Sequence, residues 1–522
     1  MVLNATHVHA ILPSSPFYAD LRLQNTGSRR RYTLIEKVHS FIEEAGIQFS
    51  VEVLPSENTL DALAGQQVGH FLWKSMKMAF HLLAVPGVGD RFLETFGSFG
   101  TLQTIMQKLI HQNLSSQVTL IPRLSARFTD FLQAILRSLA GDRDEVQELT
   151  CWKKLFLHPL LTTGFHGSTS SSTTRNKDMD HRFDLFAQGH YHLLFDLLAD
   201  TGGEDLPQRS TTQQSTTRAM KFLRYGALSR AYQQLQSKVG LAPPTSDTKE
   251  ALLGLHPPGA GLEHDLAFED IEAFTAEDVH ATLKKVKRLS GPGPSGLRFE
   301  HLLTSTHACP DFSILLAKVC TKLARGAVPQ SILPLLGGGR LVPFQKPGRG
   351  VRPIVLPETF RKLTGKLILR RSAEALCTAL SPYQFGVGMK GGLETMTLGI
   401  RTTLESTLSC DTLISFDCSN AFNKIKRSSI AAQVIGLPEI SNYLKVFYEA
   451  DKPLISNLDL DLLSSEGVLQ GDPLGPALFA LGLHPALHAV ASRHPDIKAF
   501  AYLDDVSLCG PAESVLAASF TL

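Results

Sequence analysis

The sequence predicts an α+β fold for this 522-residue chain, and three observations carry that prediction. Residues 499–501 and 506–508 are short apolar segments on either side of a turn, as in a β-hairpin. Residues 413–416 form another apolar, strand-like segment. Thr275 and Asp278 match a capping box that opens a helix with one apolar face. We therefore expect strands together with helices in the C-terminal part, after a mainly helical N-terminal region.

Composition is that of a globular protein without a secretory or membrane segment. With 43% hydrophobic residues the chain can bury sizeable cores, and its length suggests two to four domains. The seven cysteines are scattered without a C-x-x-C pair, which argues against zinc knuckles and a disulfide framework. No apolar span reaches membrane length, and no charged-then-apolar leader is visible. We expect a soluble nuclear or cytoplasmic protein that is not secreted.

Acidic residues stand where the strand-like segments end. Asp504 and Asp505 occupy the predicted hairpin turn, and Asp417 ends the upstream apolar segment. Such carboxylates are either solvated turn residues or hard-oxygen ligands for Mg²⁺. An Asp that ends a buried strand costs desolvation free energy unless it is paired or coordinated. Folding is expected to bring the three residues together.

Between these acidic sites, residues 467–479 form a Gly- and Pro-rich turn that leads into an apolar helix-like segment. The order of the three elements resembles the palm of reverse transcriptases, most closely those of non-LTR retroelements. The resemblance implies an RNA-directed DNA polymerase with a right-hand fold, in which Asp417, Asp504 and Asp505 hold two Mg²⁺ ions. One ion would lower the pKa of the primer 3′-hydroxyl, and the other would hold the triphosphate and the leaving pyrophosphate.

The same resemblance assigns roles to four further residues. Phe422 would wall the sugar of the incoming nucleotide and exclude a 2′-hydroxyl, although it could equally be a core aromatic. Asn420 would approach the triphosphate. Gln470 and Gly471 would lie against the nucleotide and the template.

Residues 341–356 look like the fingers hairpin of that family, with two strand-like segments around a Lys-Pro-Gly-Arg-Gly turn. Lys346 and Arg352 match its triphosphate-binding cations, since Arg offers a planar fork and Lys a compact charge. The alternative is a solvated basic loop.

Upstream, residues 290–302 resemble the segment that opens the fingers, with Ser295 where Asp is commoner. The basic residues 284–288 could contact template phosphates or remain in water near a helix end.

A fainter resemblance lies in the N-terminal part. Residues 82–91 resemble the hairpin of a helix-hairpin-helix module, in which backbone amides near Gly87 and Gly89 would grip a DNA phosphate. A helix C-cap followed by a turn is the alternative for these glycines.

The expected organisation has five parts: an unassigned segment 1–75, a helix-hairpin-helix at 76–110, a helical region with a Ser/Thr-rich linker at 111–217, a helical extension at 218–270, and fingers with a partial palm at 271–522. The chain stops shortly after Asp505, so a truncated retroelement-derived protein lacking a thumb is expected. Expected partners are an RNA or DNA template with its primer, deoxynucleoside triphosphates, and DNA at 82–91. A catalytically inactive nucleic-acid-binding remnant and a DNA-junction-binding accessory protein stay open as alternatives.

Overall fold

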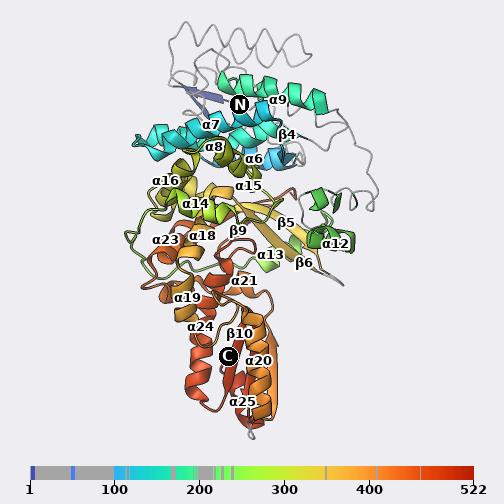
Figure 1. The fold of residues 1–522 in the computed structure, drawn as a ribbon, viewed down its shortest axis with the longest axis vertical. Coiled ribbons are helices and arrows are strands. Elements are labelled where there is room, and N and C mark those ends of the chain that lie inside the picture. Colours follow the sequence, from blue (N-terminus) through green and yellow to red (C-terminus); the bar gives the residue numbers. More distant parts are fainter. Residues whose placement is uncertain are drawn as a thin grey trace. The chain divides into compact units, whose positions relative to one another are not determined.

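The computed structural model divides the chain into two compact units, residues 1–207 and 208–522, and each is described by itself. It describes residues 2–5, 49–52, 99–111, 115–116, 118–165 and 172–191, then parts of 193–236, and 240–522 without 347–349, 407–409 and Asp459 (Figure 1). Gly87 and Gly89 lie outside the described residues, so the helix-hairpin-helix stays a prediction.

The first unit is mainly helical in its described part. Its helices are α6 (Phe99–His111), α7 (Pro122–Ala140), α8 (Glu145–Thr163) and α9 (Ser172–Ala187), and its short strands are β1 (Val2–Ala5), β2 (Phe49–Glu52), β3 (Ser115–Ser116) and β4 (Gly164–Phe165). An aromatic cluster fills the space between α7, α8 and α9, where the buried His158 ring stacks on Phe128 at 4.7 Å. His158 is therefore a core residue. Residues 172–174, in the tract expected to be a linker, begin α9.

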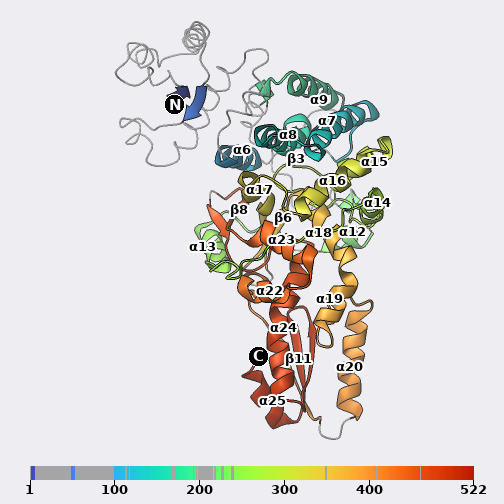
Figure 2. The ribbon, with the colours of Figure 1, turned by 90° about the vertical axis from the view of Figure 1, so that its left-hand side faces the viewer.

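The second unit mixes helices with two sheets (Figure 2). Its helices are α12 (Leu228–Gln236), α13 (Ser246–Leu255), α14 (Ala276–Leu283), α15 (Phe299–Ala308), α16 (Phe312–Ala324), the 3₁₀ turn η2 (Gln330–Ile332), α17 (Leu333–Gly337), α18 (Thr359–Arg371), α19 (Ala373–Leu380), α20 (Gly392–Ser406), α21 (Ala421–Lys424), α22 (Arg427–Gln433), α23 (Pro438–Tyr448), α24 (Gly475–Arg493) and α25 (Ala512–Ser519). Its strands are β5 (Gly339–Gln345), β6 (Val351–Pro357), β7 (Thr412–Asp417), β8 (Lys452–Ile455), β9 (Leu462–Ser464), β10 (Lys498–Tyr502) and β11 (Asp505–Gly510). The predicted α+β class is confirmed at this level.

The helix predicted at Thr275 is present as α14. The Asp278 amide donates to Thr275 Oγ1 at 3.1 Å, and the Thr275 amide donates to Asp278 Oδ2 at 3.1 Å, which closes the capping box. The helix ends at Leu283, so the exposed basic residues Lys284, Lys285, Lys287 and Arg288 follow it.

The first sheet contains four strands in the order β6-β5-β8-β9. The predicted hairpin is formed by β5 and β6, which pair from Gly339 with Pro357 to Gln345 with Val351. A short segment runs along the other side of β5, where the Ala242 amide donates to Pro343 O at 3.0 Å. The edge of β5 that faces away from β6 is thus covered by this segment and by β8.

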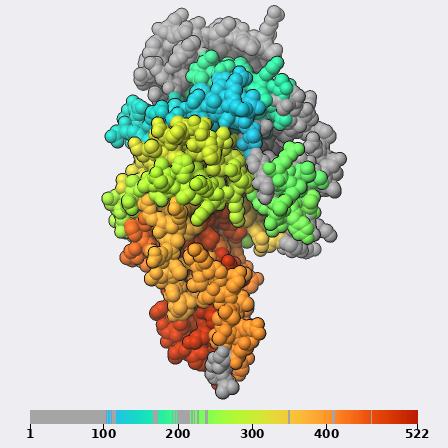
Figure 3. All heavy atoms as spheres, in the orientation of Figure 1, coloured from blue at the N-terminus to red at the C-terminus, as the bar shows by residue number. Residues whose placement is uncertain are grey.

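The second sheet contains β10, β11 and β7, all antiparallel. One face packs on α24 and α25 through a cluster that includes Val506, Leu508 and Leu487, with Ile414 and Phe416 against it. On β10, Phe500 points to the other face and lies against Gly399 of α20. The surface view shows α20, in orange, on the outside of this unit (Figure 3).

β7 differs from the buried strand that the sequence suggested. Its residues alternate between half-buried and exposed, and Leu413 is 43% exposed. Only one face of the strand is covered by α24 and α25, so Asp417 ends the strand on an exposed position. The argument that Asp417 pays a desolvation cost is therefore wrong.

Within the described residues, no helix is both long and apolar enough to span a bilayer.

Candidate active site

Strand pairing brings the three predicted acidic residues to one end of the three-stranded sheet. Asp505 lies directly opposite Asp417 in the register of β11 and β7. On the same face, the hydroxyls of Ser507 and Ser415 lie 3.0 Å apart. Asp504 is the second residue of the two-residue turn between β10 and β11. Asp505 belongs to β11 and not to the turn, which differs from the predicted position.

The three carboxylates form a local concentration of negative charge. Burial first, and then the charges of Asp504, Asp417 and Asp505, raise the pKa of the neighbouring Cys418 thiol. Like charges directly opposite each other destabilise a sheet. None of the three carboxylates has a salt-bridge partner among the residues that the structure describes. The end of the sheet is therefore suited to a cation.

The residues fit Mg²⁺ by chemistry and exposure. Carboxylate oxygens are the ligands this ion prefers, and it keeps several waters, which exposed side chains allow. Asp417 and Asp505 are exposed and Asp504 is half-buried. As placed, no three His, Cys, Asp or Glu side chains within the described ranges converge on one point. Metal binding would require the three carboxylates to turn toward one another, and no salt bridge to another described residue would have to break for this.

The turn at Gln470 and Gly471 lies against β6. The Val355 amide donates to Gln470 O at 2.9 Å. Gly471 has a φ of +130°, and a Cβ there would lie 2.0 Å from Val355 O. Only glycine allows this backbone to pass so close in this conformation.

The start of the same loop touches the segment after Asp417. The Val468 amide donates to Phe422 O at 2.7 Å. Gly467 has a φ of +65°, and a Cβ there would lie 2.4 Å from Phe422 O. One loop therefore contacts both the hairpin and the acidic end of the sheet.

A buried charge network anchors this loop, and sequence reasoning missed it. Asp472 and Arg361 form an ion pair in which both side chains are 0% exposed. Asp472 also accepts hydrogen bonds from the hydroxyls of Tyr443 and Tyr448, each at 2.8 Å, and from the Leu474 amide at 3.0 Å. Burial, and then Asp472, raise the pKa of Tyr448 above its ordinary range. No local pattern reveals a partner so distant in sequence.

Phe422 and Asn420 both lie next to the acidic end but are held differently. The Phe422 ring is half-buried and stacks on Phe479 of α24, with centroids 4.9 Å apart and planes 13° from parallel. Asn420 has a φ of +56°, and its amide nitrogen donates to Leu255 O at 2.8 Å. Asn423 donates to the same carbonyl at 3.0 Å. The side-chain amide of Asn420, expected to reach a triphosphate, is therefore hydrogen-bonded to the end of α13.

Lys346 and Arg352 lie on the hairpin and are both exposed. Arg352 is opposite Phe344 in the ladder, and the Lys346 amide donates to Gly350 O at 3.0 Å. Neither cation forms an ion pair with a residue in the described portion of the chain. Both are thus available to an anion.

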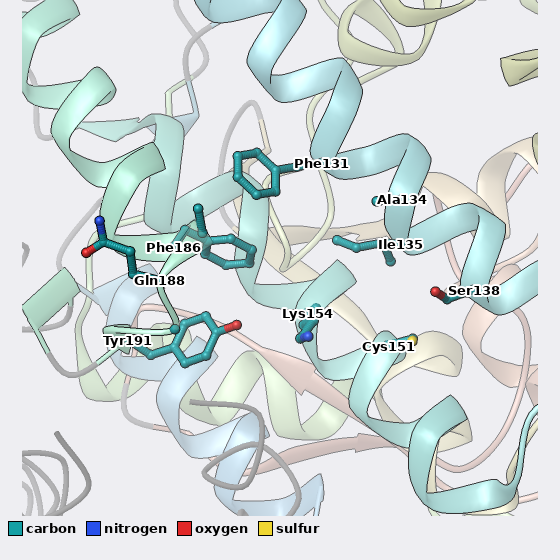
Figure 4. A pocket seen from close by; sticks show the side chains of 11 residues that line it. Phe131, Ala134, Ile135, Ser138, Cys151, Lys154, Phe186, Gln188 and Tyr191 are labelled. Carbon is teal, nitrogen blue, oxygen red and sulfur yellow. The ribbon is translucent and has the colours of Figure 1, made fainter. Parts of the chain in front are cut away.

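A pocket in the first unit contains none of these residues. It has a volume of about 320 Å³, and its lining includes Phe131, Phe186, Tyr191, Cys151 and Lys154. Figure 4 shows the aromatic rings gathered on one side, with Lys154 and Cys151 facing them. No carboxylate lines it, so it offers no site for the chemistry expected of the second unit.

Comparison with known proteins finds a family match for the C-terminal part of the second unit. Residues 344–521 match the family described as reverse transcriptase (RNA-dependent DNA polymerase). The chain is 29% identical over 258 residues to the retrotransposable element SLACS 132 kDa protein of Trypanosoma brucei gambiense, covering 47% of this chain and 21% of that protein. It is 26% identical over 260 residues to the transposon TX1 uncharacterized 149 kDa protein of Xenopus laevis, covering 45% of this chain and 19% of that protein. The chain thus spans about a fifth of the length of these relatives. The matched region is a reverse transcriptase domain of the non-LTR retroelement type.

Proposed function

We propose that the second unit catalyses template-directed DNA synthesis, in which a primer 3′-hydroxyl attacks a deoxynucleoside triphosphate. Asp417, Asp504 and Asp505 are the residues that hold two Mg²⁺ ions in this proposal. The observation that carries it is the pairing of Asp505 opposite Asp417, with carboxylates that have no salt-bridge partner among the described residues. The three-stranded sheet with α24 and α25 would be the palm, and the β5–β6 hairpin would belong to the fingers.

Bound Mg²⁺ would supply a more acidic 3′-hydroxyl and neutralise charge on the leaving pyrophosphate. The chain's own residues hold and orient the reactants. The strand register fixes the backbone positions of Asp417 and Asp505 more rigidly than a loop would, so both residues stand at the same end of the sheet. Lys346 and Arg352 receive the triphosphate, Arg through its planar fork and Lys as a point charge.

Phe422 and the neighbouring loop that contains Gly467, Gln470 and Gly471, here called the glycine loop, shape the nucleotide site. Stacking on Phe479 favours the present orientation of the Phe422 ring, which would then lie against the sugar of the nucleotide. A 2′-hydroxyl would meet this ring, which favours deoxynucleotides. The turn at Gln470 and Gly471 presents backbone rather than side chain near the hairpin. The exposed residues Lys284, Lys285, Lys287 and Arg288 suit template phosphates.

The test is primer extension by the 522-residue chain with Mg²⁺, an RNA template and a DNA primer. Asp417→Asn and Asp504→Asn should each lower the rate about 1,000-fold or more, because metal stabilisation of the transition state is worth several kcal/mol. Asp461→Asn is the control, since Asp461 is also an exposed aspartate.

Template binding, measured by fluorescence anisotropy, should change little in the same variants because phosphate contacts dominate affinity. Full synthesis by either variant would contradict the metal assignment. Template binding by the wild-type chain without synthesis would favour the inactive remnant. Binding of junction DNA that depends on Gly87 and Gly89 would favour the accessory protein.

A further inference from the structure

We infer that Gln384 is a positioning residue that holds the backbone of the acidic turn, an inference that rests on the proposed function of Asp504 and Asp505. Gln384 is 3% exposed and lies between α19 and α20, far from the acidic residues in sequence. Its side-chain amide reaches the residue immediately before Asp504.

The turn between β10 and β11 adopts a conformation that its sequence does not favour. Tyr502 pairs with Asp505, so Leu503 and Asp504 alone form the connection. Leu503 has a φ of +58°, whereas Asp504 is not among the residues of positive φ. In a two-residue hairpin loop with positive φ at the first position, glycine is the usual residue. A bulky residue there persists only when its surroundings hold it.

Gln384 supplies that hold on both backbone groups of Leu503. Its Oε1 accepts from the Leu503 amide at 2.7 Å, and its Nε2 donates to Leu503 O at 3.4 Å. Oε1 also accepts from the Gly386 amide at 3.0 Å. Two backbone amides thus donate to Oε1, which sets the orientation of the Gln384 side-chain amide, with Oε1 toward the Leu503 amide and Nε2 toward Leu503 O. One buried side chain thus brackets the turn residue.

The segment that carries Gln384 is itself fixed to the sheet. The Ala501 amide donates to Tyr383 O at 2.8 Å, and the Phe385 amide donates to Ala501 O at 2.7 Å. Gly386 lies so close to the turn that a Cβ there would be 2.9 Å from Leu503 Cγ. The segment therefore acts as an additional edge beside β10.

Gln384 therefore controls where Asp504 and Asp505 project, without having to contact the nucleotide. A shift of about 1 Å in a reacting group can cost roughly 100-fold in rate, so the bracket matters for chemistry as well as stability. Groups that orient metal ligands are typically worth about 10–100-fold in metal affinity or activity.

The decisive experiment is hydrogen–deuterium exchange of the Leu503 amide in the metal-free 522-residue chain. Gln384→Met keeps the side-chain length but removes the amide, and should accelerate this exchange at least ~10-fold. Gln384→Glu keeps an acceptor for the Leu503 amide and should retain most of its protection. Gln330→Met is the control, because Gln330 is exposed in η2.

Mn²⁺ affinity, measured by electron paramagnetic resonance, should fall about 10–100-fold in Gln384→Met. In primer extension the same variant should lower kcat with little change in the KM for deoxynucleotide. Unchanged Leu503 exchange would overturn the inference. Equal acceleration at Leu503 and across residues 339–345 would also overturn it, because that result indicates general destabilisation.

The two proposals fail separately. If Asp417→Asn and Asp504→Asn retain activity, the proposed function fails, while the exchange result still tests whether Gln384 holds the backbone of Leu503. If these variants are inactive but Gln384→Met exchanges like wild type, the bracket alone fails.

Discussion

Asp472→Asn should destabilise the second unit strongly although it changes only one side-chain atom. The substitution keeps the shape of the side chain and an acceptor for the Tyr443 and Tyr448 hydroxyls, but it removes the charge that balances Arg361. Burial alone would lower the pKa of Arg361, and the Asp472 carboxylate raises it above its ordinary value instead. Because an arginine side chain stays protonated in proteins, Arg361 will remain charged in the variant without the carboxylate that pairs with it.

The magnitude follows from the complete burial of both side chains. Breaking a buried ion pair by removing one partner costs about 3–5 kcal/mol, a large part of a typical stability of about 5–15 kcal/mol. The melting temperature should fall by roughly 5–8 °C. Arg361→Met should cost a similar amount, because it leaves the Asp472 carboxylate buried without its cation.

The assay is urea unfolding of the wild type, both single variants and the double variant Arg361→Met/Asp472→Asn. The double variant contains neither charge, so its loss should be smaller than the sum of the single losses by roughly 1–3 kcal/mol. Additive losses, or a single loss below about 1 kcal/mol, would refute the reasoning that the pair is a coupled buried unit.

Three further outcomes are expected. Burial lowers the pKa of Lys362 from 10.5 to about 8. Between these pH values the unfolded chain keeps a proton that the folded chain has released, so the contribution of Lys362 to stability rises with pH. Lys362→Gln should therefore reduce the rise in urea midpoint between pH 7.5 and 10, and an unchanged rise would contradict the lowered pKa. Gly471→Ala should cost several kcal/mol in urea unfolding, because of its positive φ and the contact with Val355 O, whereas Gly254→Ala, in open space within α13, should stabilise by about 0.5–1 kcal/mol. Phe422→Val should admit ribonucleotides in a competition assay while deoxynucleotide use survives; an unchanged selectivity ratio would make Phe422 a core aromatic only.

The sequence predicts the structure where one short segment, or two adjacent segments, determine it. The capping box at Thr275 and the pairing of adjacent strands in the two hairpins depend only on neighbouring segments, and all are present. The exposure of Asp417 was predicted wrongly, because an apolar segment does not reveal whether one or both faces of its strand are covered.

The long-range contacts could not be predicted in the same way. Arg361 and Asp472 carry no periodicity or spacing that links them, and only the packing of α18, α23 and the glycine loop brings them together. Gln384 was missed because its function depends on the backbone conformation of Leu503, which a Leu at that position does not suggest.

The contacts of the glycine loop restrict how the β5–β6 hairpin can move. This loop is hydrogen-bonded to the Val355 amide on one side and to Phe422 O on the other. A tilt of β6 near Val355 would therefore also displace the segment that follows Asp417. Val355 is therefore a fixed point in β6, and Arg352 lies roughly 10 Å beyond it along the strand. We therefore expect a movement of Arg352 and Lys346 toward a bound anion to bend the hairpin beyond Val355, while the pairing of β7 with β11 keeps Asp417 opposite Asp505.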